Sequence, residues 1–257
     1  MNTNTEVMNQ IAELALAYSG TAIIQWKTTS GQICEAPAAR NLLGRHLYLA
    51  DAIRMPKSFP RMRNYFGLYY FAQTQSHVWH ESVNEANMMA FLDHTESIAA
   101  INSQPMQMTF GDGSWHVPDL LALHSNHRQV VYDIKLASAI GSKELAQFAK
   151  TQAVCDTVGW GYQVLPTLSH QHQENLTHLS YFKHPLFRPG NEAVHRLFAA
   201  LKTPTTFDEA AGVLRPDALP QGRASLFHLL WLREVSTDLN SRIDSNTPIV
   251  STPDALF

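Results

Sequence analysis

Three short stretches decide the fold that the sequence predicts: VWHESVNE at residues 78–85, VPD at residues 117–119, and VVYDIK at residues 130–135. The first runs into an apolar segment with helical character, and the third is apolar on both faces, which is typical of an interior strand. We therefore expect one acid on a helix, one at the start of a strand, and an acid-x-lysine pair at the end of the next strand.

These acids predict a site for a hard divalent cation. Hydrolysis of a phosphodiester requires neutralisation of developing negative charge and a hydroxide at neutral pH, and one or two Mg²⁺ or Mn²⁺ ions provide both. Such ions prefer carboxylate, carbonyl and water oxygens. The expected metal ligands are Glu85, Asp119 and Asp133, with the backbone carbonyl of Ile134 as a neutral oxygen and Glu81 as the alternative helical ligand.

Lys135 is expected beside the metal, because residues two apart on a strand point to the same face. Its ammonium group can orient the attacking water or balance developing charge. Two alternatives remain open. Glu85 stands three residues after Ser82 and can complete a capping box instead of binding metal, and Asp133 can form a simple ion pair with Lys135. Asp112, between two glycines, is interpreted as a turn residue.

The residues also resemble a known family. Pro118-Asp119, then Asp133-Ile134-Lys135, preceded by a helical Glu, resembles the PD-(D/E)xK nuclease fold. Flanking motifs are similar to the TnsA-type endonuclease subunit of heteromeric bacterial transposases, over roughly residues 61–164. These motifs are Glu81-Ser82-x-x-Glu85, Phe91-Leu92-Asp93, Ser103-Gln104-Pro105 and Cys155-Asp156-x-x-Gly159-Trp160-Gly161-Tyr162. The family often has Gln where Asp133 stands, whereas Asp is commoner in the wider nuclease fold.

The resemblance implies an α/β fold with a restriction-endonuclease-like mixed sheet flanked by helices. It also implies a Mg²⁺- or Mn²⁺-dependent DNA endonuclease with Glu85, Asp119, Asp133 and Lys135 as catalytic residues. Such a subunit cuts the 5′ (non-transferred) strand at transposon ends together with a DDE-type transposase, and an AAA+ regulator and a homodimer are further expected partners. The alternatives are a stand-alone nuclease of a defence or repair system, and a non-catalytic scaffold that recruits DNA or a transposase.

Charge and composition favour delivery to DNA by partners. A net charge of −3 over 257 residues is not that of a protein that coats DNA alone. The N-terminus lacks the features of a signal peptide, and no apolar run is long enough to span a membrane, so a cytoplasmic protein is expected. Cys34 and Cys155 form no CxxC pair and are expected as reduced thiols.

The chain is expected to have three parts: an N-terminal helix and hairpin extension (1–60), the nuclease core (61–184), and a small, mainly helical, winged-helix-like C-terminal module (185–257). A strand over 115–123 and a helix over 224–240 are predicted. The predicted DNA-binding residues are Arg54, Lys57, Arg61, Arg63 and Lys150, since basic residues beside aromatic ones suit a nucleic-acid backbone. Arg223, His228 and Arg233 could touch DNA, but the few basic residues of this module favour protein binding.

Overall fold

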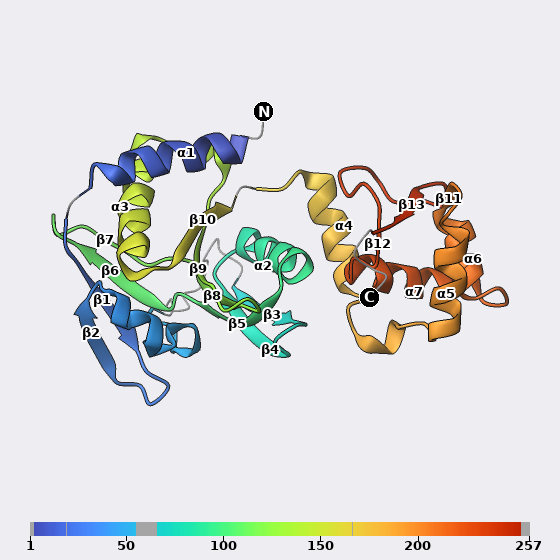
Figure 1. Cartoon of the computed structure of the whole chain (residues 1–257), viewed down its shortest axis with the longest axis horizontal. Coiled ribbons are helices and arrows are strands. Elements are labelled where there is room, and N and C mark those ends of the chain that lie inside the picture. Colours follow the sequence, from blue (N-terminus) through green and yellow to red (C-terminus); the bar gives the residue numbers. More distant parts are fainter. Residues whose placement is uncertain (1–2, 19, 55–65, 166, 253–257) are drawn as a thin grey trace. The chain divides into compact units, whose positions relative to one another are not determined.

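The computed structural model describes residues 3–18, 20–54, 66–165 and 167–252, and its fold is mixed α/β, as predicted (Figure 1). The chain forms two compact units. The first comprises residues 1–89 and 96–167, and the second comprises residues 90–95 and 168–257. None of the helices in the described part of the chain is both long and apolar enough to cross a membrane.

One sheet of the first unit is antiparallel throughout, in the order β2-β1-β6-β7. Its strands are β1 (Ala22–Lys27), β2 (Ile33–Pro37), β6 (Met106–Phe110) and β7 (Trp115–His116). Alternate residues of β1 and β6, such as Ile24 and Met108, are buried, whereas their neighbours are partly exposed. This period of two is the pattern of a sheet with one face on the core.

A second sheet has the order β10-β9-β8-β5 and carries the predicted acids. Its strands are β5 (Ile98–Ser103), β8 (Leu120–His124), β9 (Gln129–Ile134) and β10 (Gly161–Leu165). Neighbours β5, β8 and β9 run antiparallel, while β9 and β10 run parallel and are joined by helix α3 (Ser142–Val158). A parallel pair requires such a crossover connection.

The predicted strand over residues 115–123 is wrong in extent. The chain forms β7 in one sheet, leaves the ladder at residues 117–119, and enters the other sheet as β8. Pro118 lies in this break, where it has no backbone N–H to give to a ladder. The break positions Asp119 immediately before β8.

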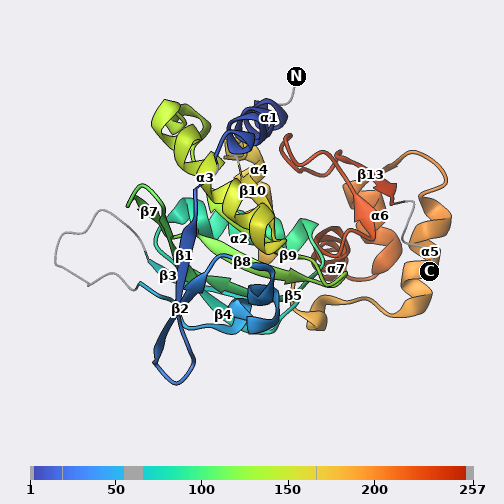
Figure 2. The same cartoon turned by 60° about the vertical axis from the view of Figure 1, so that its left-hand side comes forward.

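The core of the first unit lies beneath α3. Phe148 and Val154 of α3 pack with Val131 of β9 and with buried residues of the first sheet. Helix α1 (Thr3–Leu16) lies alongside α3 in both views (Figures 1 and 2). Both cysteines are free thiols, as expected, and Cys155 is fully buried in this core.

Helix α2 (Val83–Thr95) carries the predicted helical acid. It follows the hairpin of β3 (Gly67–Phe71) and β4 (Ser76–His80). Met88, Met89 and Leu92 are buried on it. Its last residues, 90–95, belong to the second unit. Single 3₁₀ turns complete the described elements: η1 (Arg40–Arg45), η2 (Leu47–Leu49), η3 (Ala137–Ala139) and η4 (Pro185–Phe187).

The second unit is mainly helical, with a small sheet in the order β11-β13-β12. In chain order its elements are α4 (His170–Ser180), α5 (Asn191–Ala200), β11 (Thr205–Thr206), α6 (Phe207–Leu214), α7 (Leu219–Trp231), β12 (Val235–Ser236) and β13 (Pro248–Ser251). Its own core includes Leu197, Leu226 and Leu229. The unit begins at Leu168, ahead of the boundary expected at residue 185, because α4 packs on α7.

The predicted helix over residues 224–240 is wrong at both ends, since α7 spans Leu219–Trp231. Pro220 fits the start because the first turn needs no intrahelical N–H. At the end, Arg233 adopts left-handed backbone (φ 59°), and the N–H of Glu234 donates to the carbonyl of Leu229 at 3.0 Å. This is a helix-terminating pattern that a non-glycine residue makes hard to recognise from sequence.

His94 makes the stability of the second unit depend on pH. The ring is 7% exposed, and its Nδ1 is 2.9 Å from the carbonyl oxygen of Trp231. Burial lowers the pKa of His94 from 6.5 to about 4. Between these two values the unfolded chain binds a proton that the folded chain does not, so stability falls as the pH falls through this window.

His94 alone should therefore lower the free energy of unfolding in urea by about 2 kcal/mol at about pH 5 relative to about pH 7.5, in addition to the falls contributed by His172 and His228, whose pKa values are also lowered by burial. His94→Gln should remove most of this difference while costing some stability at the higher pH. An unchanged pH dependence in His94→Gln would assign it to other groups.

Candidate functional site

Asp119 and Asp133 are brought together by the pairing of β8 and β9. Leu120 is opposite Tyr132 in this antiparallel pair, so Asp119 and Asp133 are the next opposed residues, with side chains on the same face. The backbone N–H of Ile134 donates to Asp119 Oδ2 at 2.6 Å, and the backbone N–H of Gln104 donates to the Asp119 carbonyl at 2.9 Å. Both the carboxylate and the backbone of Asp119 are therefore fixed.

Negative charge is concentrated around Asp119. Burial raises the pKa of Asp119 well above its usual value, and the negative charges of Asp133, Glu85 and Glu81 raise it further. The Ile134 N–H acts in the opposite direction. A group whose charged form is disfavoured in this way is stabilised by a bound proton or by a cation.

Asp133 is 2% exposed and has more hydrogen bonds than the sequence suggests. His116 Nε2 lies 2.9 Å from both carboxylate oxygens, and the Tyr162 hydroxyl donates to Oδ2 at 2.5 Å. Gln147 Nε2 lies 2.7 Å from the other ring nitrogen of His116. Among the described residues Asp133 forms no ion pair with Lys135, so that alternative interpretation is wrong.

Glu85 serves as a helix cap. Its backbone N–H donates to Ser82 Oγ at 3.2 Å, and its Oε1 accepts from the Ser82 hydroxyl at 2.9 Å. Its Oε2 accepts from the Glu81 backbone N–H at 2.8 Å. The capping interpretation of Glu85 is thus confirmed, with both carboxylate oxygens in use. Burial raises the pKa of Glu85, and the two hydrogen bonds partly offset this rise.

Glu81 has one occupied and one unoccupied oxygen. Its Oε2 accepts from Arg54 at 2.9 Å, whereas Oε1 is buried and has no hydrogen-bond partner within the described ranges. Gln104 presents a similar case. Its side chain is 4% exposed, its amide oxygen Oε1 has no partner among the same residues, and its backbone is left-handed (φ 47°).

Lys135 follows β9 directly and is half-buried. Its backbone N–H donates to the Leu165 carbonyl at 3.3 Å, which extends the pairing with β10. Its ammonium group makes no salt bridge with any residue that the structure describes. The charge therefore remains available for a negatively charged ligand.

The structure brings together two of the predicted ligands, Asp119 and Asp133, but not a complete set. In the described part of the chain, no three His, Cys, Asp or Glu side chains are close enough together to hold a metal ion. Glu85 is occupied by the cap and Glu81 by Arg54.

The predicted DNA-binding residues have mixed outcomes. Arg54 is paired with Glu81, and Lys150 is paired with Asp112 and also donates to Ser114 Oγ at 3.0 Å. Asp112 accepts from the Ser114 backbone at 3.0 Å, as expected of a turn residue. Lys57, Arg61 and Arg63 lie outside the described residues. In the second unit, Arg223 is held by Asp208, His228 is buried, and Arg233 donates to the Thr95 carbonyl.

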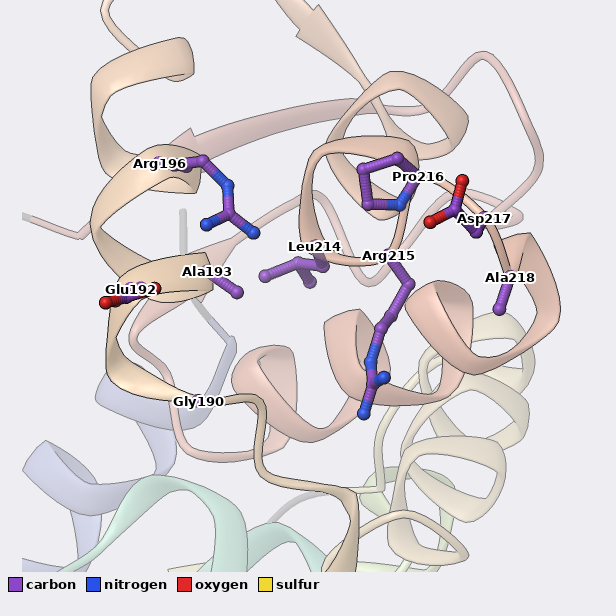
Figure 3. A pocket seen from close by; sticks show the side chains of 9 residues that line it. All are labelled: Gly190, Glu192, Ala193, Arg196, Leu214, Arg215, Pro216, Asp217 and Ala218. Carbon is purple, nitrogen blue, oxygen red and sulfur yellow. The ribbon is translucent and has the colours of Figure 1, made fainter.

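The second unit has a hollow of about 350 Å³ between α5 and the turn that joins α6 to α7 (Figure 3). Arg196 and Arg215 extend from these two elements toward the space between them, and no described carboxylate forms an ion pair with either. Its lining comprises Gly190, Glu192, Ala193, Arg196, Leu214, Arg215, Pro216, Asp217 and Ala218. Two of the lining residues are arginines and two are acids (Glu192 and Asp217). The lining therefore has no excess of positive charge that would select anions.

No protein-family model matches this chain, and no curated protein matches it. Sequence reasoning missed His116, Gln147 and Tyr162. Tyr162 carried one signal, since it alternates with Val164 on the strand beside β9 and so shares its buried face.

Proposed function

We propose that this protein is a metal-dependent endodeoxyribonuclease of the PD-(D/E)xK type, resembling the TnsA subunit that cuts the 5′ strand at transposon ends beside a DDE-type transposase. The observation that carries the proposal is the pair Asp119–Asp133, with the raised pKa of Asp119 and with Lys135 two residues further on. Two opposed carboxylates, followed two residues later by a lysine that forms no salt bridge with a described residue, have a direct use in phosphodiester hydrolysis and no evident structural need.

The order of elements supports the same fold. Helix α2, strands β5, β8 and β9, helix α3 and strand β10 occur in this order along the chain, with β6 and β7 of the other sheet between β5 and β8, and the four strands are neighbours in one mixed sheet. The PD-(D/E)xK resemblance implies such a mixed sheet, with one acid before its second strand and the acid-x-lysine pair at the end of its third.

The second unit has the order expected of a winged-helix-like module. Helix α5, strand β11, helices α6 and α7, and strands β12 and β13 follow in sequence, with β13 between the other two strands. Most of α7 is buried, and its Arg223 is held by Asp208. A protein partner therefore suits this module better than the reading of a DNA groove.

The donor set fits a hard cation such as Mg²⁺ or Mn²⁺. Asp119 and Asp133 supply carboxylates, Glu81 Oε1 and Gln104 Oε1 are buried oxygens without a described donor, and the Ile134 carbonyl is the further neutral oxygen. Glu81 approaches the aspartates when a DNA phosphate competes for Arg54, which gives Arg54 its DNA-binding role. Glu85 then holds the backbone of Glu81 in place.

The chemistry divides among these residues. A cation at this site would lower the pKa of a bound water and offset charge on the phosphate. Asp119 and Asp133 would supply the carboxylate oxygens that bind the cation. A backbone hydrogen bond fixes the position of the first carboxylate, and a side-chain hydrogen bond fixes that of the second. Lys135 supplies the charge that balances the developing phosphorane or orients the attacking water.

Nicking of supercoiled plasmid DNA tests the function. With Mn²⁺, with and without a candidate DDE-type transposase, wild type should nick, and Lys135→Met should reduce the rate by about 100-fold or more, since one lost stabilising group commonly costs this much. Lys143→Met is the control, because Lys143 lies exposed on α3 and should leave the rate unchanged.

The outcomes separate the candidate functions. Nicking only with the transposase supports the TnsA-like function, and nicking by the protein alone supports a stand-alone nuclease. Equal nicking by Lys135→Met and wild type would contradict the proposed site. Absence of nicking under every condition would favour the scaffold.

A further inference from the structure

A buried polar network surrounds Asp133 and joins four elements of the first unit. It consists of His116 in β7, Asp133 in β9, Gln147 in α3 and Tyr162 in β10. The side chain of His116 is 13% exposed and that of Asp133 is 3% exposed. The network is therefore shielded from water, and its hydrogen bonds are stronger than exposed ones.

The network fixes the tautomer of His116. In this structure the side-chain amide nitrogen of Gln147 faces His116 Nδ1, and because this nitrogen is a donor only, Nδ1 accepts from it. The ring proton then sits on Nε2 and is donated to both oxygens of Asp133, each at 2.9 Å. The His116 ring thus holds both oxygens of the carboxylate through a forked hydrogen bond.

These hydrogen bonds leave one lone pair of the Asp133 carboxylate without a donor among the described residues. A carboxylate has about four lone-pair positions, two on each oxygen. Oδ2 accepts from His116 and from Tyr162, whereas Oδ1 accepts from His116 alone. One lone pair of Oδ1 remains without a described donor.

We propose that His116 is a positioning residue which, with Tyr162 and Gln147, presents the open lone pair of Asp133 Oδ1 to a divalent cation shared with Asp119. The proposal rests on the proposed function and deepens it, because it names the residues that orient one ligand. His116 does not touch substrate or metal itself. It acts through Asp133, as the outer partners of metal ligands do.

A purely structural role explains the network poorly. A carboxylate buried in this position costs free energy even when it is hydrogen-bonded, and apolar residues of similar volume would stabilise the core as well or better. Retaining an anion with three supporting polar side chains is useful where its remaining lone pair binds something. Asp119 is opposite Asp133 in the β8–β9 pair, with its side chain on the same face, so it is the second carboxylate available to that cation.

Calorimetric titration of the full chain with Mn²⁺, with and without a short DNA duplex, tests the proposal. His116→Leu should weaken Asp119-dependent Mn²⁺ binding by about 10- to 100-fold, which is the usual effect of losing an outer partner of a ligand. His116→Gln keeps an N–H donor and should recover most of the affinity. Tyr162→Phe should give a smaller loss than His116→Leu.

The chain offers a matched control. His124 of β8 and Tyr132 of β9 are also buried and bonded to each other, with His124 Nε2 2.8 Å from the Tyr132 hydroxyl, and among the described residues neither side chain hydrogen-bonds to Asp133. His124→Leu should lower the melting temperature about as much as His116→Leu but leave Mn²⁺ affinity unchanged.

Three results would overturn the inference. The first is wild-type affinity in His116→Leu, and the second is an equal loss of affinity in the His124→Leu control. In the third, the wild type shows no Asp119-dependent Mn²⁺ binding with or without DNA, and the proposed function then fails with the inference. If wild type binds and His116→Leu is unchanged, only the positioning role is lost.

Discussion

Asp119→Ala is expected to abolish Mn²⁺ binding and to reduce metal-dependent DNA nicking by more than about 100-fold. Asp119 is the acid most affected by its neighbours, since burial and three nearby carboxylates raise its pKa. Removing it leaves Asp133 as the remaining acid of the opposed pair, which is too little to hold Mg²⁺ or Mn²⁺ without its partner. The measurements are calorimetric titration and plasmid nicking with the same preparations.

The control for this prediction is Asp112→Ala. Asp112 is also an acid, but it lies in the turn between β6 and β7 of the first sheet and is exposed, and hydrogen bonds from Lys150 and Ser114 hold its pKa well below the usual value. Asp112 therefore serves the turn, and Asp112→Ala should have no effect on metal binding. Equal activity of wild type and Asp119→Ala would exclude the carboxylate site, whatever the result for Asp112→Ala.

Gly222→Ala is expected to destabilise the second unit by about 3 kcal/mol, at the upper end of the usual cost of overpacking. Gly222 is buried where α7 crosses α6, and a Cβ atom there would lie 2.2 Å from the carbonyl oxygen of Ala211. The obstructing atom is backbone, so no side-chain rotation can relieve the contact. The higher helix propensity of alanine recovers about 1 kcal/mol at most. Urea unfolding, followed by circular dichroism, measures the loss.

Gly212→Ala provides the matched comparison. Gly212 lies in α6, and an added Cβ would meet nothing within 4 Å. This substitution should stabilise the unit by about 0.4–1 kcal/mol, because alanine restricts the unfolded chain. If both substitutions had the same effect, close helix packing at Gly222 would not be the cause.

The sequence predicts well what depends on local period and spacing. A run that is apolar on both faces indicated β9 as an interior strand, and its four central residues are buried. An acid at the start of one strand and an acid at the end of the next were expected, and the antiparallel pairing of β8 with β9 brings Asp119 and Asp133 opposite one another. The capping alternative for Glu85 also followed from spacing alone, because Ser82 precedes it by three residues.

What depends on distant packing could not be predicted. His116 lies in one sheet and Asp133 in the other, so their contact follows from how two sheets pack rather than from any spacing in the chain. Likewise, the pairing of Arg54 with Glu81 joins residues separated by a segment whose course the sequence does not reveal. Arg54 and Lys150 are predicted from sequence as DNA contacts because the sequence does not reveal that Glu81 and Asp112 pair with them.

Helix α2 has a consequence for how this protein can be divided. Its first turn belongs to the unit with the acids, while residues 90–95 belong to the second unit, where Asp93 is bonded to Lys183 and His94 to Trp231. The second unit is therefore discontinuous in the chain. A fragment ending at Thr167 would lose the partners of Asp93 and His94, and a fragment starting at Leu168 would lack the six residues 90–95 that belong to this unit. During synthesis, residues 90–95 cannot take their place in the second unit until their partners Lys183, Trp231 and Arg233, made about a hundred residues or more later, have been added to the chain. To exchange this unit between related proteins, residues 90–95 of α2 would have to be exchanged together with residues 168–257, although they lie between the two chain segments of the first unit.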